Sequence, residues 1–197
     1  MTQNIYLLIP NATVMQQDFI DRINVGLKKT IRQMLQSSYM VETAHICAIT
    51  FTNKAVLDMP LQPLADIIEI PEIKTRKAYK SYSVNFRTLM TFLEYRRLLE
   101  NPENKLSDIV VICVNELLFN TKKLTAIVEE LASLKGILAI FIVNVDKNRD
   151  CFSLLYDYCA NFLPNSNASN TLGDFLLNKE IHDIIAIEPN KIYFDGY

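Results

Sequence analysis

The sequence predicts an α/β protein built on a doubly wound, mainly parallel six-stranded sheet with one antiparallel edge strand and helices on both faces. Three observations lead to this class. Short apolar runs alternate with amphipathic segments, as in proteins whose parallel strands are joined by crossover helices. The runs are apolar throughout, which is typical of strands buried on both faces. The length of 197 residues, with 50% of them hydrophobic, fits one folded domain.

The first strand and the first helix are the clearest elements. Residues 5–9 (IYLLI) form an apolar run that Pro10 ends, which predicts a buried strand. From Met15 to Ser37 the apolar residues recur every three or four positions, so we expect an amphipathic helix. Residues 44–51 (AHICAITF) then supply the second strand.

A hairpin and an irregular segment follow. Residues 55–57 come three positions after the second strand and predict its antiparallel edge partner. Residues 59–83 contain three prolines and no sustained period, so we expect a surface excursion with one helical turn near residues 63–67.

The second half repeats the alternation of strands and helices. Its predicted elements are a helix from Phe86 to Leu98, a strand 109–114, a helix 121–134 capped by Gly136, a strand 137–143, a helix 150–159, a short strand at 162–163, a polar loop 164–170 and a helix 171–182. We assign residues 1–185 to one domain and 186–197 to a C-terminal extension. The apolar side chains of that extension need burial, on their own domain or against a partner.

Composition and charge exclude several classes of function. The net charge of -2 provides no positive field for nucleic acid or for an anionic membrane. The longest apolar runs, 109–114 and 137–143, are far shorter than the roughly 20 residues that cross a bilayer. The first residues lack the features of a secretory signal, so we expect a soluble, cytoplasmic protein. The four cysteines show no CxxC spacing and are interpreted as reduced thiols, and both histidines as structural or surface residues.

The expected site lies at the carboxyl ends of the parallel strands, on one end of the sheet. In doubly wound sheets the loops at this edge meet at the point where strand order reverses, so the loops after Ile9 and Val114 should lie together. Neither loop has the glycines that a nucleotide or flavin phosphate needs, and the chain contains no GxSxG elbow. We therefore predict no cofactor and no enzymatic activity.

The order of elements resembles the von Willebrand factor A (VWA) domain, and within it the bacterial VWA proteins associated with tellurite resistance. The segments that carry the likeness are residues 5–15, 20–27 (IDRINVGL), 42–51 (ETAHICAITF), 59–65 (MPLQPLA) and 86–93. The resemblance runs from about Asn4 to His182 and lies in scaffold positions. It implies a doubly wound fold and a role in protein–protein interaction.

In that family a first loop reading Asp-x-Ser-x-Ser, a Thr of a second loop and an Asp of a third hold a divalent cation. On this chain the first-loop positions fall on Pro10, Ala12 and Val14, the second on Ser83 or Val84, and the third on Asn115, next to Glu116. Mg²⁺ prefers octahedral oxygen ligands with at least one carboxylate, and the first loop supplies none. The resemblance therefore implies a degenerate, metal-free site. A shift of one residue would bring Asn11 and Thr13 into the ligand positions, with oxygens but no charge.

One basic and aromatic segment precedes the second of these loops. Its members are Lys74, Arg76, Lys77, Tyr79, Lys80, Tyr82 and, further on, Arg87. Such a run is either a solvated loop or a docking patch, because Tyr and Arg are favoured at interfaces. The candidate partner-binding residues are Asn11, Thr13, Arg76, Lys77, Tyr79, Tyr82 and Glu116.

The leading hypothesis is a cytosolic, non-enzymatic VWA-like adaptor that has lost its metal site. The resemblance implies protein partners of a bacterial stress or phosphorylation system. Two alternatives stay open. The first is a metal-dependent VWA protein that binds a partner carboxylate through Mg²⁺, and the second is a flavodoxin-like small-molecule binder.

Overall fold

The computed structural model describes most of the chain. The described residues are 2–11, 17–52, 54–75, 86–103, 105, 107–115, 129–131, 133–145, 151–165, 184–188 and 191–195. Everything said below about structure concerns these residues.

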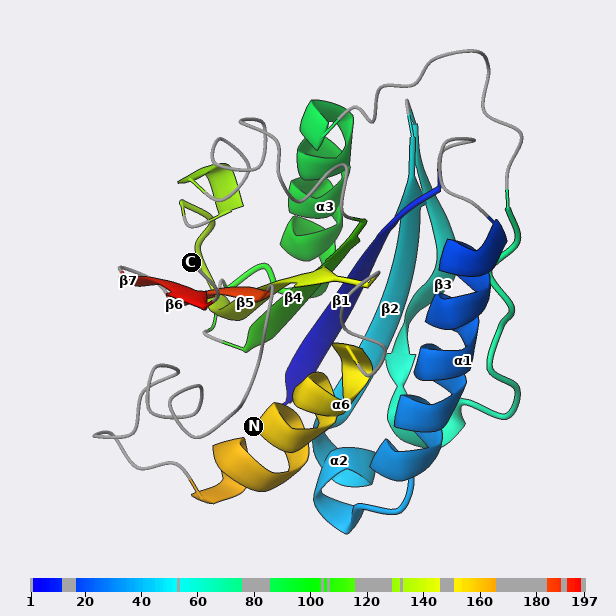
Figure 1. Cartoon of the computed structure of the whole chain (residues 1–197). Helices are drawn as coiled ribbons and strands as arrows, with labels where there is room; N and C mark the ends of the chain where they lie inside the picture. The colour runs from blue at the N-terminus through cyan, green and yellow to red at the C-terminus, as the bar shows by residue number, and fades with distance from the viewer. Residues whose placement is uncertain are drawn as a thin grey trace.

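The centre of the molecule is one seven-stranded sheet in the order β3-β2-β1-β4-β5-β6-β7 (Figure 1). The strands are β1 (Gln3–Pro10), β2 (Ala44–Phe51), β3 (Ala55–Pro63), β4 (Asp108–Val114), β5 (Ile137–Asn144), β6 (Ile184–Glu188) and β7 (Lys191–Asp195). Strands β2, β1, β4 and β5 pair in parallel, whereas β3, β6 and β7 join antiparallel. The mixed α/β class with a parallel centre is confirmed.

The number and direction of the outer strands differ from the prediction. The sheet has seven strands instead of six, and antiparallel strands lie at both edges instead of one. The predicted short strand at 162–163 is wrong, because Phe162 ends a π-helical turn and Leu163 begins a 3-10 turn. The sixth and seventh strands come from residues 184–195, most of which the sequence assigned to the extension. These two strands form because they pair with neighbouring strands, and no alternating pattern in the local sequence predicted them.

Strand β3 is longer than expected. It continues from Ala55 through Pro60 to Pro63, where the sequence predicted an irregular excursion from residue 59 onward. A proline cannot donate to the ladder and is tolerated at a sheet edge or beside a bulge. Strand β3 is an edge strand, and its pairing with β2 shifts register twice, so both conditions are met. The expected helical turn is present as a 3-10 turn, η1 (Leu64–Asp66).

The helices largely follow the predicted periods. They are α1 (Gln17–Met34), α2 (Ser38–Thr43), α3 (Phe86–Glu100) and α6 (Cys151–Tyr156), and α6 continues through η2 (Asp157–Phe162) and η3 (Leu163–Asn165). The helix expected from Met15 to Ser37 is α1, which ends at Met34. The short helix α2 after it was not predicted, and Ser37 caps α2 by accepting a hydrogen bond from the backbone N–H of Met40. Gly136 has a φ of 78°, the left-handed conformation that glycine adopts readily after a helix. Most of the predicted helix 121–134 and all of 171–182 lie outside the described residues.

Side-chain direction shows which helix covers which face of the sheet. The hydroxyl of Tyr6 in β1 reaches Glu100 of α3, so α3 lies on the face to which Tyr6 points. Leu7 points to the opposite face and is in register with Phe141 across β4, and the ring of Phe141 packs edge-on against Tyr158 of η2. Figure 1 accordingly shows α1 and α6 on one side of the central strands and α3 on the other.

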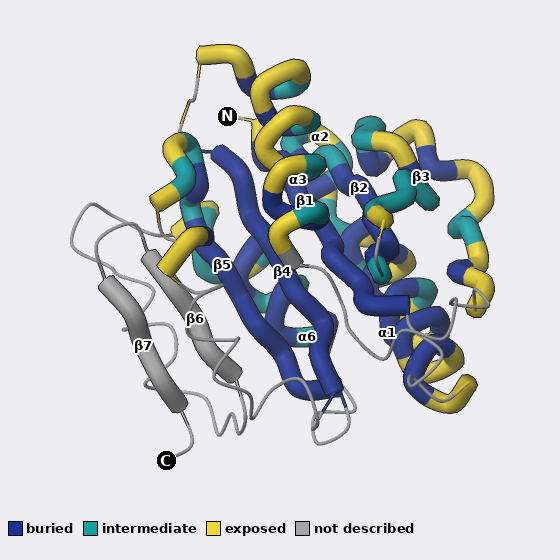
Figure 2. Tube along the Cα trace, turned by 90° about the horizontal axis from the view of Figure 1, so that it is seen from above, coloured by how far each residue is buried: buried dark blue, intermediate teal, exposed yellow. Residues whose placement is uncertain are grey.

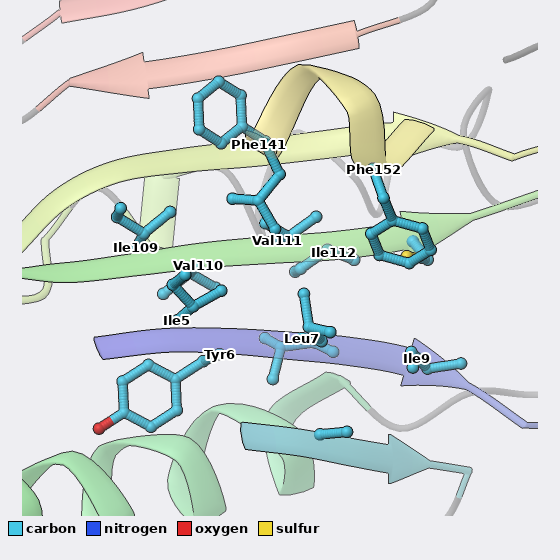
Figure 3. Close-up of a cluster of buried hydrophobic side chains, with 14 of the residues drawn as sticks. Ile5, Tyr6, Leu7, Ile9, Ile109, Val110, Val111, Ile112, Phe141 and Phe152 are labelled. Carbon is cyan, nitrogen blue, oxygen red and sulfur yellow. The ribbon is translucent and has the colours of Figure 1, made fainter. Parts of the chain in front are cut away.

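The core is formed mainly by the central strands. Every residue of β1 and β4 is buried, and the dark tube in Figure 2 follows β4 and β5 along their length. Figure 3 shows how the aliphatic side chains of β1 and β4 interleave with Phe141 and Phe152. Within the described residues no helix is long and apolar enough to span a membrane.

Candidate functional site

The carboxyl ends of β1 and β4 form the switch point of the sheet. From β1 the chain continues to β2 and β3 on one side, and later strands lie on the other side, beginning with β4. Asn11 follows β1 directly, and Asn115 follows β4. This edge is where doubly wound sheets hold their ligands. The structure therefore brings together the two loop origins that the sequence identified.

The end of β1 is buried and engaged with the rest of the protein. Pro10 is buried, and Asn11 is only 2% exposed. The backbone N–H of Asn11 donates to the carbonyl of Phe51 at 2.9 Å, and its side-chain Nδ2 donates to the carbonyl of Lys74, also at 2.9 Å. Asn11 thus ties β1 to the end of β2 and to a segment more than sixty positions later in the chain.

A second asparagine fixes that same segment. Asn24 of α1 is buried, and its Nδ2 donates to the carbonyl of Ile73 while its Oδ1 accepts from the N–H of Ile73, both at 2.9 Å. Thr75 adds a hydrogen bond from its hydroxyl to Oε1 of Gln17. Residues 73–75 are therefore held against α1 and the end of β1, and they lead directly into the basic and aromatic segment.

Replacing Asn24 by alanine should detach this segment locally. Both side-chain bonds to Ile73 are lost, and the backbone groups they satisfied stay behind in a buried position. We expect the free energy of unfolding to fall by about 1–3 kcal/mol. Amide hydrogen exchange at Ile73 should accelerate more than exchange in β1. If exchange at Ile73 is unchanged, the asparagine does not anchor the segment.

The described residues at this edge do not fit a Mg²⁺ ion. Pro10 offers no side-chain oxygen, Nδ2 of Asn11 is directed at Lys74, and Asn115 supplies a buried neutral amide. The carboxylate bonded to the end of β2 is Asp58, whose Oδ2 accepts from the hydroxyl and the N–H of Thr50. Across the described part of the chain, no three His, Cys, Asp or Glu side chains group as a metal site would require. A hard cation needs several oxygens, usually with a carboxylate, and the described residues at this edge do not present such a set.

Most of the predicted site residues lie outside the described residues. These are Ala12, Thr13, Val14, Arg76, Lys77, Tyr79, Tyr82, Ser83, Val84 and Glu116. Pro10, Asn11 and Asn115 are described, and all three are buried at the predicted edge.

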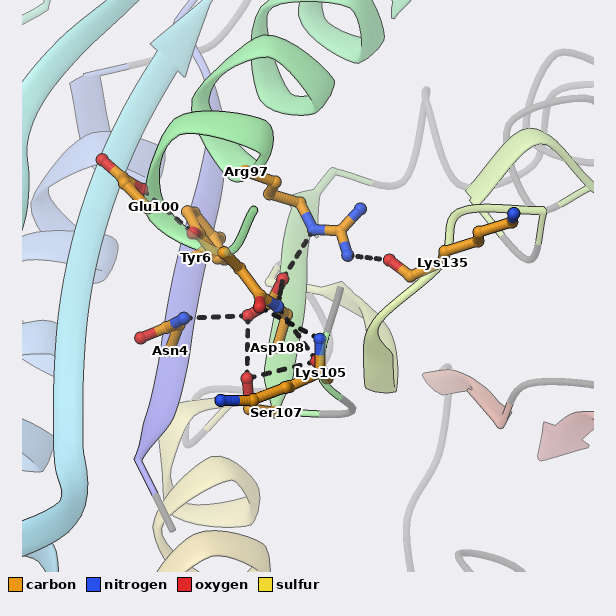
Figure 4. Close-up of polar contacts among 9 residues, drawn as sticks. Asn4, Tyr6, Arg97, Glu100, Lys105, Ser107, Asp108 and Lys135 are labelled. Carbon is orange, nitrogen blue, oxygen red and sulfur yellow. Dashed lines mark hydrogen bonds and ion pairs between the residues drawn. The ribbon is translucent and has the colours of Figure 1, made fainter. Parts of the chain in front are cut away.

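A polar cluster that was not predicted from the sequence lies at the other end of the parallel strands, where β1 and β4 begin (Figure 4). Its centre is Asp108, which is fully buried at the start of β4. The Nε of Arg97 donates to Oδ2 of Asp108 at 2.9 Å, and Nδ2 of Asn4 donates to Oδ1 at 2.9 Å. Asn101 and Ser107 donate to the same carboxylate at 3.2 and 3.4 Å. The second guanidinium contact of Arg97 is to the carbonyl of Lys135.

A second carboxylate lies beside this cluster. The hydroxyl of Tyr6 donates to Oε2 of Glu100 at 2.9 Å, and Arg96 pairs with Oε1 of Glu100 at 2.6 Å. Burial raises the pKa of Tyr6 far above its usual value, and the charges of Asp108 and Glu100 raise it further. Tyr6 therefore remains a protonated donor. Two sequence features could have predicted this cluster: a tyrosine inside an apolar strand and an aspartate just before another. Each needs a hydrogen-bonding partner when it is buried.

No family model and no curated protein sequence matches this chain. The solved structures to which it is similar include the ArnB paralog VWA2 of Sulfolobus acidocaldarius, at 12% identity and a TM-score of 0.42 over 73% of this chain. Two structures of proximal thread matrix protein 1 from the mussel byssus match at 10% and 12% identity, with TM-scores of 0.47 and 0.42 over 82% and 73% of this chain.

The chain is much shorter than these neighbours. It covers 34%, 46% and 38% of their respective lengths. The structure itself shows a mixed α/β protein with a parallel central sheet.

Proposed function

We propose that this chain is a non-enzymatic, VWA-type protein-interaction module that has lost its metal site and serves as an adaptor or scaffold. The proposal is supported by the sequence resemblance and by the doubly wound arrangement around β1. The observation that carries it is the end of β1, where Pro10 occupies the position of the family's carboxylate and Asn11 is bonded to Phe51 and Lys74. An edge without an anionic anchor recognises its partner through shape and side-chain contacts.

The basic and aromatic segment is the proposed docking element. Residues 73–75 fix its beginning against α1, and Arg76, Lys77, Tyr79 and Tyr82 follow within a few positions. A tethered segment loses less conformational entropy when it binds, which favours recognition. The proposed setting is the cytoplasm of a bacterium, with partners from a stress or phosphorylation system.

Affinity capture with and without a chelator tests this function. The chain should retain the same proteins from a cytoplasmic extract in EDTA and in Mg²⁺, because no cation takes part. The triple variant Arg76→Ala, Lys77→Ala, Tyr79→Ala should weaken retention at least about tenfold, since Tyr and Arg anchors often contribute 2 kcal/mol or more. Thermal stability should be unchanged.

A matched control removes charge elsewhere. Lys29→Ala with Arg32→Ala takes two exposed cations from α1 and should leave capture intact. Capture that is lost in EDTA, together with Mg²⁺ binding by the purified chain in calorimetry, would contradict the proposal and favour the metal-dependent alternative. Equal capture by the triple variant would remove the docking role of the segment.

A further inference from the structure

The two edges of the sheet differ in how well they are protected against pairing with another strand. An edge strand presents unpaired N–H and C=O groups, and proteins blunt such edges with prolines, bulges or charges. Strand β3 has this protection, because Pro60 and Pro63 lack an N–H and because its pairing with β2 shifts register twice. A further strand at this edge would find an incomplete ladder.

Strand β7, at the other edge, has none of these features (Figure 1). Its five residues, Lys-Ile-Tyr-Phe-Asp, include no proline and no glycine, and all five pair with β6 in one continuous register. The three central residues, 192–194, are of types favoured in strands. Among the described residues no strand lies on the outer side of β7. This edge is therefore open to pairing along its whole length.

The sequence of β7 is complementary to itself when two copies run antiparallel. With the pairing centred on Tyr193, Lys191 of one copy faces Asp195 of the other, and Ile192 faces Phe194. Because the arrangement is symmetric, a Lys–Asp pair forms at each end of the ladder. Opposite charges directly across a strand pair stabilise it, and like charges destabilise it.

The hydrogen-bond pattern of an edge strand is compatible with this register. Alternate residues direct both backbone groups away from the neighbouring strand, so two edges pair only where residues of the same alternation face each other. The register centred on Tyr193 meets this condition, because Ile192 and Phe194 are two positions apart. A shift of one residue breaks the condition. A shift of two residues shortens the ladder from five pairs to three and removes both Lys–Asp pairs.

Two properties limit such an assembly to two copies. Self-pairing about a twofold axis uses the same edge of both chains and leaves no β7 strand open. The edges that remain are the two β3 strands, which their prolines protect. The net charge of only -2 per chain also means that little electrostatic repulsion opposes association.

We propose that this chain forms a homodimer in which the β7 strands of two copies pair antiparallel, centred on Tyr193, so that the two sheets become one continuous sheet. This interface is separate from the proposed docking element. That element begins at residues 73–75, which are held against α1 and the end of β1, and β7 lies four strands away from β1 in the sheet. The two proposals therefore concern different surfaces, and either can fail without the other.

Sedimentation velocity of the full chain tests the dimer. We expect a monomer–dimer equilibrium between about 1 and 100 µM, because a short strand pair buries little area and binds weakly. Asp195→Lys places two positive charges opposite each other at each end of the ladder. This variant should weaken dimerisation about fivefold or more.

Mixing two variants tests the register itself. The second variant carries Lys191→Glu, together with Glu188→Gln because position 188 faces position 191 within the β6–β7 pair. Each variant alone should dimerise weakly, since like charges face each other at both ends of the ladder. An equimolar mixture with the Asp195→Lys chain should dimerise as strongly as the native protein, because every lysine then faces a carboxylate. Recovery on mixing would also show that both variants are folded.

A cross-link locates the contact. Facing residues of an antiparallel pair have Cα atoms about 4.5–5.5 Å apart, a separation that a disulfide spans. Three native cysteines are buried in the described structure, and Cys151→Ser removes the fourth. In that background Tyr193→Cys should form a disulfide-linked dimer under mild oxidation, whereas Val25→Cys, exposed on α1, should not. A chain that stays monomeric at 100 µM, or a dimer of unchanged affinity in Asp195→Lys, would overturn the proposal.

Discussion

Replacing Asp108 by alanine is expected to lower the free energy of unfolding by about 3–5 kcal/mol. The carboxylate is fully buried and is bonded to Arg97, which is itself 6% exposed at the side chain. Removing Asp108 leaves that guanidinium buried without its counter-charge, and Asn4 loses an acceptor as well. Urea denaturation followed by circular dichroism measures the loss.

The exposed pair nearby provides the control. Glu103→Ala removes the partner of Lys105, and because both side chains are largely exposed it should change stability little. In the double variant, the loss in free energy of unfolding should be smaller than the sum of the losses for Arg97→Ala and Asp108→Ala, because the two side chains form one interaction. Losses for Asp108→Ala no larger than those for Glu103→Ala would show that the buried pair does not hold α3 to β4.

Replacing Phe152 by alanine is expected to cost a similar amount, about 3–5 kcal/mol. The ring is 1% exposed and points from α6 toward the central strands (Figure 3). Its neighbour in α1 is Gly26, where an added Cβ would lie 2.7 Å from Cδ2 of the ring. The close approach of the two helices therefore depends on the absence of a side chain at position 26.

This contact predicts that Gly26→Ala changes stability in opposite directions depending on whether residue 152 is phenylalanine or alanine. In the native protein, Gly26→Ala should be destabilising, because overpacking costs about 1–3 kcal/mol and exceeds the helix preference of alanine over glycine, roughly 1 kcal/mol. In the Phe152→Ala background the clash is absent, and the same substitution should stabilise. Thermal unfolding of the four proteins of this cycle measures the effect. Stabilisation by Gly26→Ala in both backgrounds would refute the packing argument.

The central elements were accessible from sequence because their signals are local. Residues 44–51 were predicted as a strand with the bounds that β2 has in the structure. The helix period from Phe19 to Met34 reflects one buried stripe, which the structure confirms, whereas Leu35, counted in the same period, lies beyond α1 and is exposed. The outer strands were less accessible, since β3 contains prolines, and β6 and β7 exist through pairing with neighbours distant in sequence.

The candidate site also has a part that local sequence signals predicted and a part that they did not. The switch-point loops were located from the alternation of strands and helices, and Asn11 and Asn115 lie where this predicts. The sequence did not show that Asn11 and Asn24 hold residues 73–75, because these bonds join positions dozens of residues apart. A cavity at the end of α3, lined in part by His45, was missed for the same reason, since its lining comes from separate parts of the chain.

The sequence by itself determined the α/β class, the parallel centre of the sheet and the absence of a carboxylate at the end of β1. Each of these depends on residue type and short-range period, which chain order preserves. Only the tertiary structure decided the strands β6 and β7 at the second edge, the burial of Asp108 with Arg97, and the cavity at the end of α3. Those features arise from contacts between distant segments, whose free energy depends on geometry that no local pattern encodes.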